Sequence, residues 1–375
     1  MESIIYVGVD VHKATNSVCM FDREHNRYLG EAARMEAGAQ FLTKFLRKAR
    51  KDFALAPSVR FLIGYEAGPT GFGLCRAMNK VQGCTCVIMA PTTIARASGQ
   101  KVKTDRRDAM LLAVTLANGT YRKVALPDSE DEAAKEYTRM RNTLARHLKK
   151  AKQNLLSFLL RAGCSYPFPG SYWTGKFRQW LKSIRFGNGL LQLAFEQYLQ
   201  ETEDLRAKLE LIDARIEELA DSERYREKVG RLVCFTGIQT HLALSFCCEV
   251  GDFSRFPDAR RFASFLGICP GQESSGQKVR YNTITKCGNT RLRLLLVEAA
   301  KGIKRSSPYG KSKRILARQQ GQCPSVIAYA DRGSRRVRGK IAQLEKKGKN
   351  CNVATVAGAR ELACFIWGMM TDNIG

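Results

Sequence analysis

Two carboxylates stand three residues apart within a cluster of basic residues, directly before an apolar run. Asp105 and Asp108 lie in the stretch Lys-Val-Lys-Thr-Asp-Arg-Arg-Asp-Ala, which begins at Lys101. Thr104 is a good helix N-cap, and the apolar residues 109–116 predict that the helix continues into a core. Both acids would then fall on one face of the first turn. They repel each other unless a cation lies between them, either a neighbouring arginine or a divalent metal.

Two further acids, Asp10 and Glu66, each end a short run rich in β-branched or aromatic residues. Strand and helix patterns across residues 4–116 predict a mixed sheet with helices on its faces, an α/β fold. Ligands of such sheets bind at the carboxyl ends of the strands, where these two acids fall. A single acid there is most often a turn residue, but acids that converge from three segments need a hard cation such as Mg²⁺.

The charge of the chain points to a polyanionic partner. Its 375 residues contain 62 Lys and Arg against 35 Asp and Glu, for a net charge of +27. Nucleic acid is the commonest polyanion in a cell.

We expect no membrane partner and no export, because we find neither an apolar run near the length of a spanning helix nor a signal peptide. The thirteen cysteines are scattered without a C-x-x-C motif, which argues against zinc and predicts reduced thiols in the cytoplasm.

The middle of the chain has the pattern of two long helices. Residues 128–161 and 191–219 both carry apolar side chains at alternating spacings of three and four. The segment between them, residues 163–189, is rich in Gly, Pro and aromatic residues and is predicted to be a loop. We therefore predict an antiparallel coiled-coil hairpin that acts as a spacer or a dimerisation arm.

The last third contains a serine motif and a basic segment. The motif Pro-Gly-Gln-Glu-Ser-Ser-Gly, residues 270–276, is predicted to be a loop that exposes a hydroxyl, although a plain turn is the commoner role of such a motif. A turn at Gly288 then leads into a helix.

The segment 301–349 is strongly basic. It holds 15 Lys and Arg and only two acids, with Tyr309 and Tyr329 interleaved. This composition predicts contact with a nucleic-acid backbone.

Four features together resemble the DEDD transposases of the insertion sequence 110 family, which are relatives of the Piv-type DNA invertases. They are Asp10 after a strand, Glu66 in Tyr-Glu-Ala-Gly-Pro-Thr-Gly, the Lys-Thr-Asp-Arg-Arg-Asp-Ala motif, and Ser-Ser-Gly followed by Ile-Thr-Lys-Cys-Gly-Asn. The resemblance covers nearly the whole chain and keeps the motifs in family order. The aromatic insertion at residues 165–187 resembles the insertion sequence 1111 group within this family.

The resemblance implies three domains and a function. The domains are a RuvC-like ribonuclease H-fold domain at residues 1–127, a coiled-coil hairpin at 128–228 and a mostly helical transposase domain at 229–375. The function is recombination of element ends with target DNA, guided by a structured RNA, in the bacterial cytoplasm at the nucleoid. That guide would explain a basicity larger than one DNA duplex demands. Because recombination holds several strand cuts together, we expect a homo-oligomer, either a dimer or a tetramer.

The resemblance also implies roles for individual residues. Four acids would bind Mg²⁺ or Mn²⁺, and these are Asp10, Glu66, Asp105 and Asp108. The nucleophile that links to DNA would be Ser275, with Ser274 as the alternative; a serine hydroxyl needs activation at neutral pH, which metal coordination can supply. The cations expected to hold nucleic acid are Lys278, Arg280, Lys286, Arg291, Arg293, Arg332, Arg335, Arg336 and Arg338.

Three other interpretations stay open. Asp105 and Asp108 could pair only with Arg106 and Arg107 at an exposed helix start. A metal-dependent junction-resolving nuclease would share the four acids but would hydrolyse DNA with water instead of a serine. A non-catalytic RNA-binding scaffold would need only the basic segment, and its acids would be structural. A covalent link between protein and DNA separates the recombinase from the nuclease and the scaffold.

Overall fold

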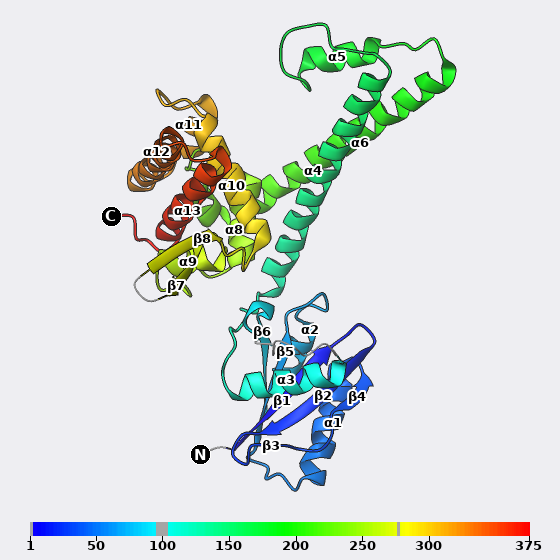
Figure 1. Cartoon of the computed structure of the whole chain (residues 1–375), viewed down its shortest axis with the longest axis vertical. Helices are drawn as coiled ribbons and strands as arrows, with labels where there is room; N and C mark the ends of the chain where they lie inside the picture. The colour runs from blue at the N-terminus through cyan, green and yellow to red at the C-terminus, as the bar shows by residue number, and fades with distance from the viewer. Residues whose placement is uncertain (1–2, 95–103, 276–277) are drawn as a thin grey trace. The chain divides into compact units, whose positions relative to one another are not determined.

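The computed structural model describes residues 3–94, 104–275 and 278–375. The chain divides into two compact units, Met1–Pro127 and Asp128–Gly375 (Figure 1). Each unit buries hydrophobic clusters of its own. The proposed boundary between residues 228 and 229 falls inside the second unit, and the division into three domains stays a prediction.

The first unit is built around a six-stranded mixed sheet, drawn mainly in blue in Figure 1. Its strands are β1 (Ile4–Val11), β2 (Thr15–Asp22), β3 (Arg27–Tyr28), β4 (Ala33–Glu36), β5 (Arg60–Glu66) and β6 (Cys84–Met89). The order is β3-β2-β1-β5-β6, and β4 also pairs with β2. β1 runs antiparallel to β2 and parallel to β5, which is parallel to β6. The predicted mixed sheet is confirmed, whereas β3 and β4 were missed because strands this short carry little readable alternation.

Helices cover both faces of this sheet. They are α1 (Ala39–Asp52), α2 (Gly73–Met78) and α3 (Asp105–Ala117), together with the short 3-10 helix η1 (Pro91–Thr93). Leu46 of α1 shares a core with Val9 of β1. On the opposite face, Leu116 of α3 packs with Met89 of β6. The predicted start of α3 is also confirmed, because the Thr104 side chain accepts a hydrogen bond from a backbone N–H of the first turn.

Two long helices of the second unit, α4 (Ser129–Arg161) and α6 (Gly189–Ala220), pack along each other in opposite directions (Figure 1). Arg141 of α4 forms an ion pair with Asp213, late in α6, at 2.7 Å. Phe158, late in α4, stacks on Phe195, early in α6, with ring centroids 6.3 Å apart. The predicted pair of antiparallel helices is therefore present, while its coiled-coil character stays a prediction.

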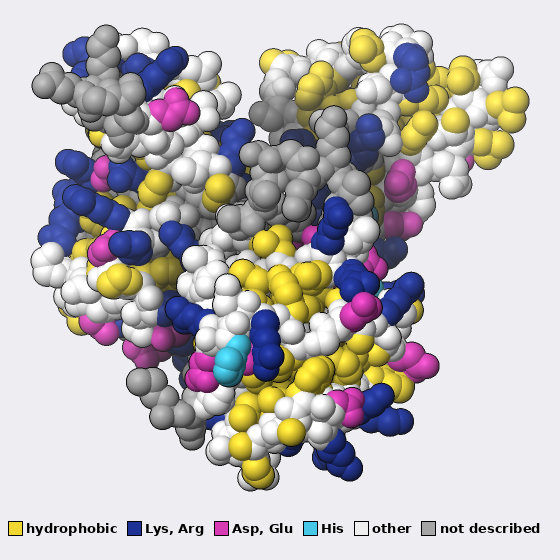
Figure 2. Space-filling view, turned by 60° about the horizontal axis from the view of Figure 1, so that its bottom comes forward, with side chains coloured by type: hydrophobic (Ala, Val, Ile, Leu, Met, Phe, Trp, Pro, Cys, Tyr) yellow, Lys and Arg dark blue, Asp and Glu magenta, His cyan; other side chains and the backbone are white. Residues whose placement is uncertain are grey.

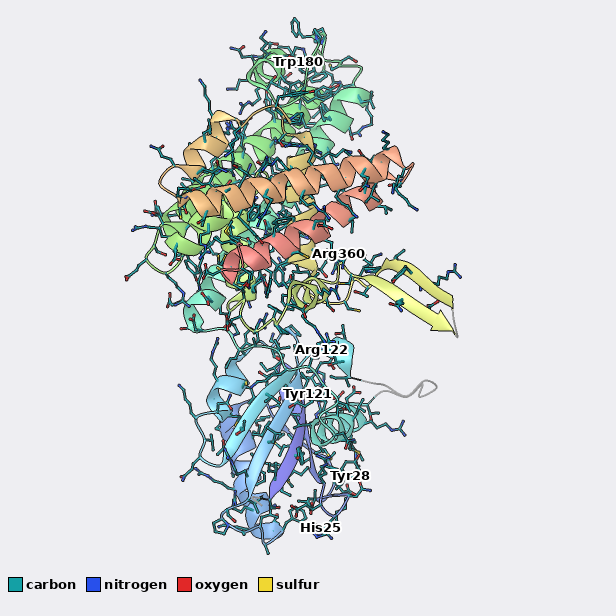
Figure 3. The ribbon with its side chains drawn as sticks, turned by 90° about the vertical axis from the view of Figure 1, so that its left-hand side faces the viewer. His25, Tyr28, Tyr121, Arg122, Trp180 and Arg360 are labelled. Atoms are coloured by element: carbon teal, nitrogen blue, oxygen red, sulfur yellow. The ribbon has the colours of Figure 1, made fainter. Side chains whose placement is uncertain are left out.

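The segment that joins these helices contains a helix, α5 (Gly175–Ser183), where a loop was predicted. Thr174 caps it by accepting a hydrogen bond from the backbone N–H of Phe177 at 3.3 Å. The Phe177 ring is fully buried, with Tyr166 and Trp180 around it at centroid distances of 5.0 and 5.4 Å. Figure 3 labels Trp180 in this region. The loop prediction was wrong here because the aromatic residues build a small core that stabilises a short helix.

The rest of the second unit is mostly helical. Its elements are α7 (Arg226–Leu232), α8 (Thr240–Val250), α9 (Ala259–Phe265), β7 (Pro270–Ser275), β8 (Lys278–Ile284), α10 (Thr290–Arg305), α11 (Lys313–Gln319), α12 (Pro324–Lys346) and α13 (Cys351–Met370). The helix predicted after Gly288 is α10, and the Asn289 side chain caps it. The serine motif was predicted to be a loop, but its residues 270–275 form β7, paired antiparallel with β8. Gly, Pro and Ser have low strand propensity, so cross-strand pairing overrides the local signal.

The expectation that no segment is long and apolar enough to span a membrane was wrong for α13. By length and composition its twenty residues meet that description, and half of the apolar window is buried within the unit. Leu362, Ala363 and Ile366 of α13 are fully buried in the main core of this unit. The apolar composition is accounted for by packing, since α13 contacts α9, α10 and α12.

A buried carboxylate links α4 to the turn before α10. Glu249 of α8 accepts hydrogen bonds from the Arg139 guanidinium at 2.7 and 3.1 Å. It also accepts one from the Asn289 side chain at 3.0 Å. The Glu249 side chain is only 4% exposed, so its charge depends on these partners.

Replacing Glu249 with alanine should lower the free energy of unfolding by about 3 kcal/mol, because Arg139 loses a bidentate partner in a half-buried position. Glu136→Ala is the matched control. It removes an exposed carboxylate from the same guanidinium, 2.8 Å away, and should cost less than about 1 kcal/mol. Urea unfolding of both variants measures the difference, and equal losses would show that burial of Glu249 is not what matters.

Candidate functional site

The distance between α3 and the sheet is set by a glycine in β1. A Cβ atom built on Gly8 would lie 2.2 Å from the backbone oxygen of Ala109 and 2.3 Å from the backbone nitrogen of Ala113. Any side chain at this position would therefore collide with the helix backbone. The absence of a side chain on Gly8 lets the helix pack directly against the strand.

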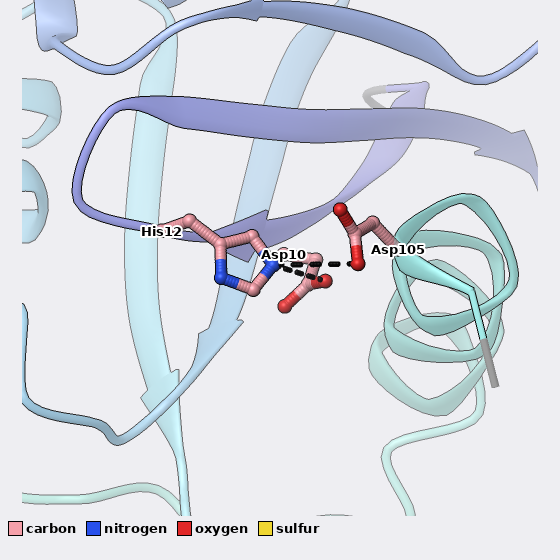
Figure 4. Close-up of side chains that lie close together, drawn as sticks. All are labelled: Asp10, His12 and Asp105. Carbon is pink, nitrogen blue, oxygen red and sulfur yellow. Dashed lines mark hydrogen bonds and ion pairs between the residues drawn. The ribbon is translucent and has the colours of Figure 1, made fainter.

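This close packing brings acids from the strand and the helix together. Asp10 follows Gly8 by two residues, so it projects from the same face of β1. Asp105 precedes Ala109 by four residues, which places it one turn earlier on the same stripe of α3. Both side chains meet His12, whose Nε2 lies 3.1 Å from Asp10 Oδ2 and 3.5 Å from Asp105 Oδ1 (Figure 4). We call these three residues the carboxylate site.

The other two predicted acids lie nearby. β1 and β5 pair with Val9 opposite Tyr65, so Asp10 and Glu66 are the next residues of two neighbouring parallel strands. Asp108 belongs to the first turn of α3 and acts on Asp10 through its charge. Glu66 is half-buried, and its role and that of Asp108 as metal ligands stay predictions.

The electrostatics of the site follow from this crowding. Burial raises the pKa of Asp10 above its ordinary value, and the charges of Asp108 and Asp105 raise it further, while His12 partly offsets both. The pairing of Asp105 and Asp108 with arginines alone does not describe the site, because Asp105 also lies beside His12 and Asp10.

The residues present fit a divalent cation. One ligand atom from each of Asp10, His12 and Asp105 lies within 4.8 Å of the other two. An octahedral ion with bonds of about 2.1 Å holds neighbouring ligand atoms about 3.0 Å apart, close to the 3.1 Å between His12 Nε2 and Asp10 Oδ2 and somewhat less than the 3.5 Å between His12 Nε2 and Asp105 Oδ1. Sequence reasoning missed His12, although the signal was available. His12 follows Asp10 by two residues, the spacing that places two side chains on one side of an extended chain.

The serine motif lies on the β7–β8 hairpin. Ser275 is the last residue of β7 and pairs in register with Lys278, and Glu273 pairs with Arg280. In Figure 3 the two strands extend away from the helices of the same unit. Gly276 and the side chains of Ser274, Ser275 and Lys278 lie outside the described part of the structure.

The predicted cations around this hairpin differ in their exposure and in their contacts with the protein. Arg280, Lys286 and Arg291 are exposed. Lys286 has a positive φ of 56°, and its backbone N–H donates to the Gly267 oxygen at 3.1 Å. Arg293 is half-buried and donates to the Leu266 oxygen at 2.9 Å, which gives it a structural role as well.

The basic segment is less uniform than its composition suggests. Tyr309 is 97% exposed, but Tyr329 is buried at 7% and packs against Phe365 at a centroid distance of 5.3 Å. The prediction that Tyr329 is available to nucleic acid was therefore wrong. Arg332 donates to the backbone oxygen of Gly375 at 2.7 Å, and Arg338 donates to the Ile303 oxygen at 3.4 Å.

Other predicted cations of α12 face outward. Arg335 and Arg336 are exposed, and Arg336 lies 3.5 Å from Glu361. On the face drawn in Figure 2, Lys and Arg side chains are spread over the surface rather than gathered in one patch.

Comparisons with known proteins identify the family. A model described as "Transposase IS116/IS110/IS902 family" matches residues 231–313, and a model of the DEDD transposases of the IS110 type matches residues 7–163. The transposase for insertion sequence element IS1533 of Leptospira borgpetersenii is 34% identical over 351 residues, which cover 93% of this chain and 99% of that protein. The chain belongs to the IS110 family of transposases.

Two further relatives have similar names. In Sinorhizobium fredii, y4qE, a protein named as a transposase, is 33% identical over 370 residues, which cover 98% of this chain and 88% of the relative. The transposase for insertion sequence element IS1111A of Coxiella burnetii is 30% identical over 155 residues, 41% of this chain and 36% of the relative. In this IS110-family transposase, the DEDD segment contains the carboxylate site and implies catalysis that depends on a divalent metal.

Replacing Gly8 with alanine should force α3 away from β1 and separate Asp10 from Asp105. We expect a loss of about 1–3 kcal/mol in the free energy of unfolding and a loss of metal-dependent DNA cleavage of at least about a hundredfold. The control is Gly73→Ala in the same unit, where an added Cβ would have no atom of the described residues within 4 Å. Cleavage at the parent rate by a folded Gly8→Ala protein would contradict the need for this close approach.

Proposed function

We propose that this transposase is an RNA-guided DNA recombinase that cuts and rejoins element ends and target DNA with a serine nucleophile. In this proposal the first unit is a RuvC-like ribonuclease H-fold domain, and α4 and α6 form a coiled-coil arm. Asp10, Glu66, Asp105 and Asp108 hold Mg²⁺ or Mn²⁺. The observation that carries the proposal is the meeting of Asp10 and Asp105 around His12 Nε2, at 3.1 and 3.5 Å, in a chain of the IS110 family.

The chemistry assigned to the serine is a phosphoryl transfer. The Ser275 oxygen attacks a DNA phosphate, the new oxygen–phosphorus bond forms, and the bond from phosphorus to the leaving deoxyribose oxygen breaks. The serine proton is lost and the leaving oxygen gains a proton, so the phosphate stays joined to Ser275. A deoxyribose hydroxyl of another strand then reverses the step and releases the serine. Divalent cations at the four acids would neutralise charge that develops on the phosphate oxygens.

Other groups of the chain would position the DNA. The exposed Arg280 and Lys286 stand before and after the end of β8 and supply positive charge near the motif. Lys278, opposite Ser275 in the register, is a third candidate. Further exposed cations, Arg291 among them, would hold DNA or a structured guide RNA. Recombination requires several cuts held together, so we propose a dimer or a tetramer, acting on DNA of the bacterial nucleoid.

Ser275→Ala should eliminate both the covalent protein–DNA adduct and recombination, because no other group in the proposal attacks the phosphate. Ser274→Ala is the matched control and should leave both largely in place. Adducts are detected as labelled DNA that migrates with the protein under denaturing conditions. Cutting and joining at near the parent rate by Ser275→Ala would favour the water-using nuclease. Loss of the adduct in Ser274→Ala alone would move the nucleophile by one residue.

Neutralising five cations of the basic segment should weaken the dependence of nucleic-acid affinity on salt. The slope of log affinity against log salt concentration should fall in magnitude by roughly 3 to 5, as counterion release requires. The five residues to be replaced by Gln are all exposed, and they are Arg305, Lys313, Arg314, Arg335 and Lys347.

The control for this measurement carries the same change of charge on the first unit. Its five exposed cations, replaced by Gln, are Arg23, Lys44, Lys48, Lys51 and Lys80. The slope of the control should stay close to that of the parent. If the slope falls only in the control, the path of the nucleic acid lies on the first unit instead.

A further inference from the structure

We propose that His12 is a nitrogen ligand of the metal at the carboxylate site and makes that site favour Mn²⁺ over Mg²⁺. This inference rests on the proposed metal-dependent function. It adds His12 to the four acids already proposed as metal ligands. It starts from one nitrogen atom, His12 Nε2, that faces both Asp10 and Asp105 (Figure 4).

The position of His12 is fixed by the backbone. β1 ends at Val11, and the backbone N–H of His12 donates to the Thr15 oxygen at 3.0 Å across the turn into β2. The imidazole thus stands beside Asp10, on the side of the chain from which Asp10 projects. Its side chain is 50% exposed, and its Nε2 atom reaches Asp105 on α3.

A proton on Nε2 can serve only one of the two carboxylates well. The Asp10 oxygen at 3.1 Å is within normal hydrogen-bond distance, whereas the Asp105 oxygen at 3.5 Å is at the outer limit. A cation has no such restriction, because it attracts both carboxylates and the nitrogen lone pair at once. Neighbouring ligands of an octahedral ion are about 3.0 Å apart, which is close to the 3.1 Å separation and about half an ångström less than the 3.5 Å separation. The arrangement therefore suits a cation held by two oxygens and one nitrogen better than a proton.

A nitrogen ligand changes which metal is preferred. Mg²⁺ takes oxygen ligands almost without exception and gives up its water reluctantly. Imidazole binds transition-metal ions more readily, and affinity at such sites rises from Mn²⁺ along the first transition series. His12 should therefore raise the affinity for Mn²⁺ and leave the affinity for Mg²⁺ nearly unchanged. Magnesium would still bind through the carboxylates.

Electron paramagnetic resonance of the full chain loaded with Mn²⁺ tests this directly, without measuring activity. Magnetic coupling between Mn²⁺ and ¹⁴N should be present in the parent, and it should change when histidine is labelled with ¹⁵N. His12→Ala should abolish the coupling and weaken Mn²⁺ binding by about tenfold, while Mg²⁺ binding changes by less than about threefold. His25→Ala is the matched control. His25 is an exposed histidine of the same unit that pairs with Asp22 at 2.7 Å, and its replacement should leave the coupling in place.

The possible outcomes separate this inference from the proposed function. Mn²⁺ that binds the parent without nitrogen coupling, but is lost in Asp10→Asn, would overturn the role of His12 and leave the metal site standing. Absence of Mn²⁺ binding in the parent, or binding unaffected by Asp10→Asn, would overturn the metal site and the His12 ligand with it. Coupling that persists in a folded His12→Ala protein would assign the nitrogen to another residue.

Discussion

The contact between Gly8 and the backbone of α3 is the constraint on which the carboxylate site depends. A glycine inside a strand weakens the strand, since it adds backbone freedom and no side chain to pack. Here Gly8 allows the helix backbone to lie in direct contact with the strand. The helix residues at this contact, Ala109 and Ala113, have small side chains that do not hold the two elements apart. Asp105 is carried to Asp10 because it stands one turn before this contact. A larger spacing would leave the same acids on the same elements, but too far apart to share an ion.

The site is electrostatically unfavourable by itself. The pKa of Asp10 is raised, so its charged form is less stable in the folded chain than in the unfolded one. The contribution of Asp10 to the free energy of unfolding is therefore most favourable at low pH. It is lost as the pH rises through the raised pKa of Asp10. At neutral pH the charged Asp10 carboxylate therefore opposes folding, and the packing of α3 must offset it. A bound cation would reverse this balance, which is typical of sites shaped by function rather than by stability.

Much of the fold is readable from local pattern, and much of the site is not. The strands that carry Asp10 and Glu66 follow from short runs of β-branched and aromatic residues, and the helix that begins after Thr104 follows from capping. The role of Gly8 could not be read, because a strand glycine does not say which element lies above it. β7 was missed because its residues have low strand propensity, and only their partners in β8 make them a strand.

The burial of Tyr329 was open to prediction but was not predicted. It stands three residues after Val326 and eight before Val337, both buried, and so falls on the apolar stripe of α12. The composition of the basic run predicts that Tyr329 belongs to a nucleic-acid surface, whereas the helical spacing assigns it to the core. The period of a pattern is stronger evidence than the composition around it, because the period follows from the geometry of the helix.

The same geometry limits what α12 can do for a polyanion. Its buried stripe faces α13, so the cations available to a partner stand on the opposite side, with Arg335 and Lys346 among the exposed ones. These two are eleven residues apart in the sequence, which is about 16 Å along a helix. One such face meets only a few phosphates. Other basic residues of the segment pair with acids, as Lys304 does with Glu345 and Lys311 with Asp331. The charge of the segment therefore exceeds what one helix face can present, and a long nucleic acid would have to be held by several elements at once.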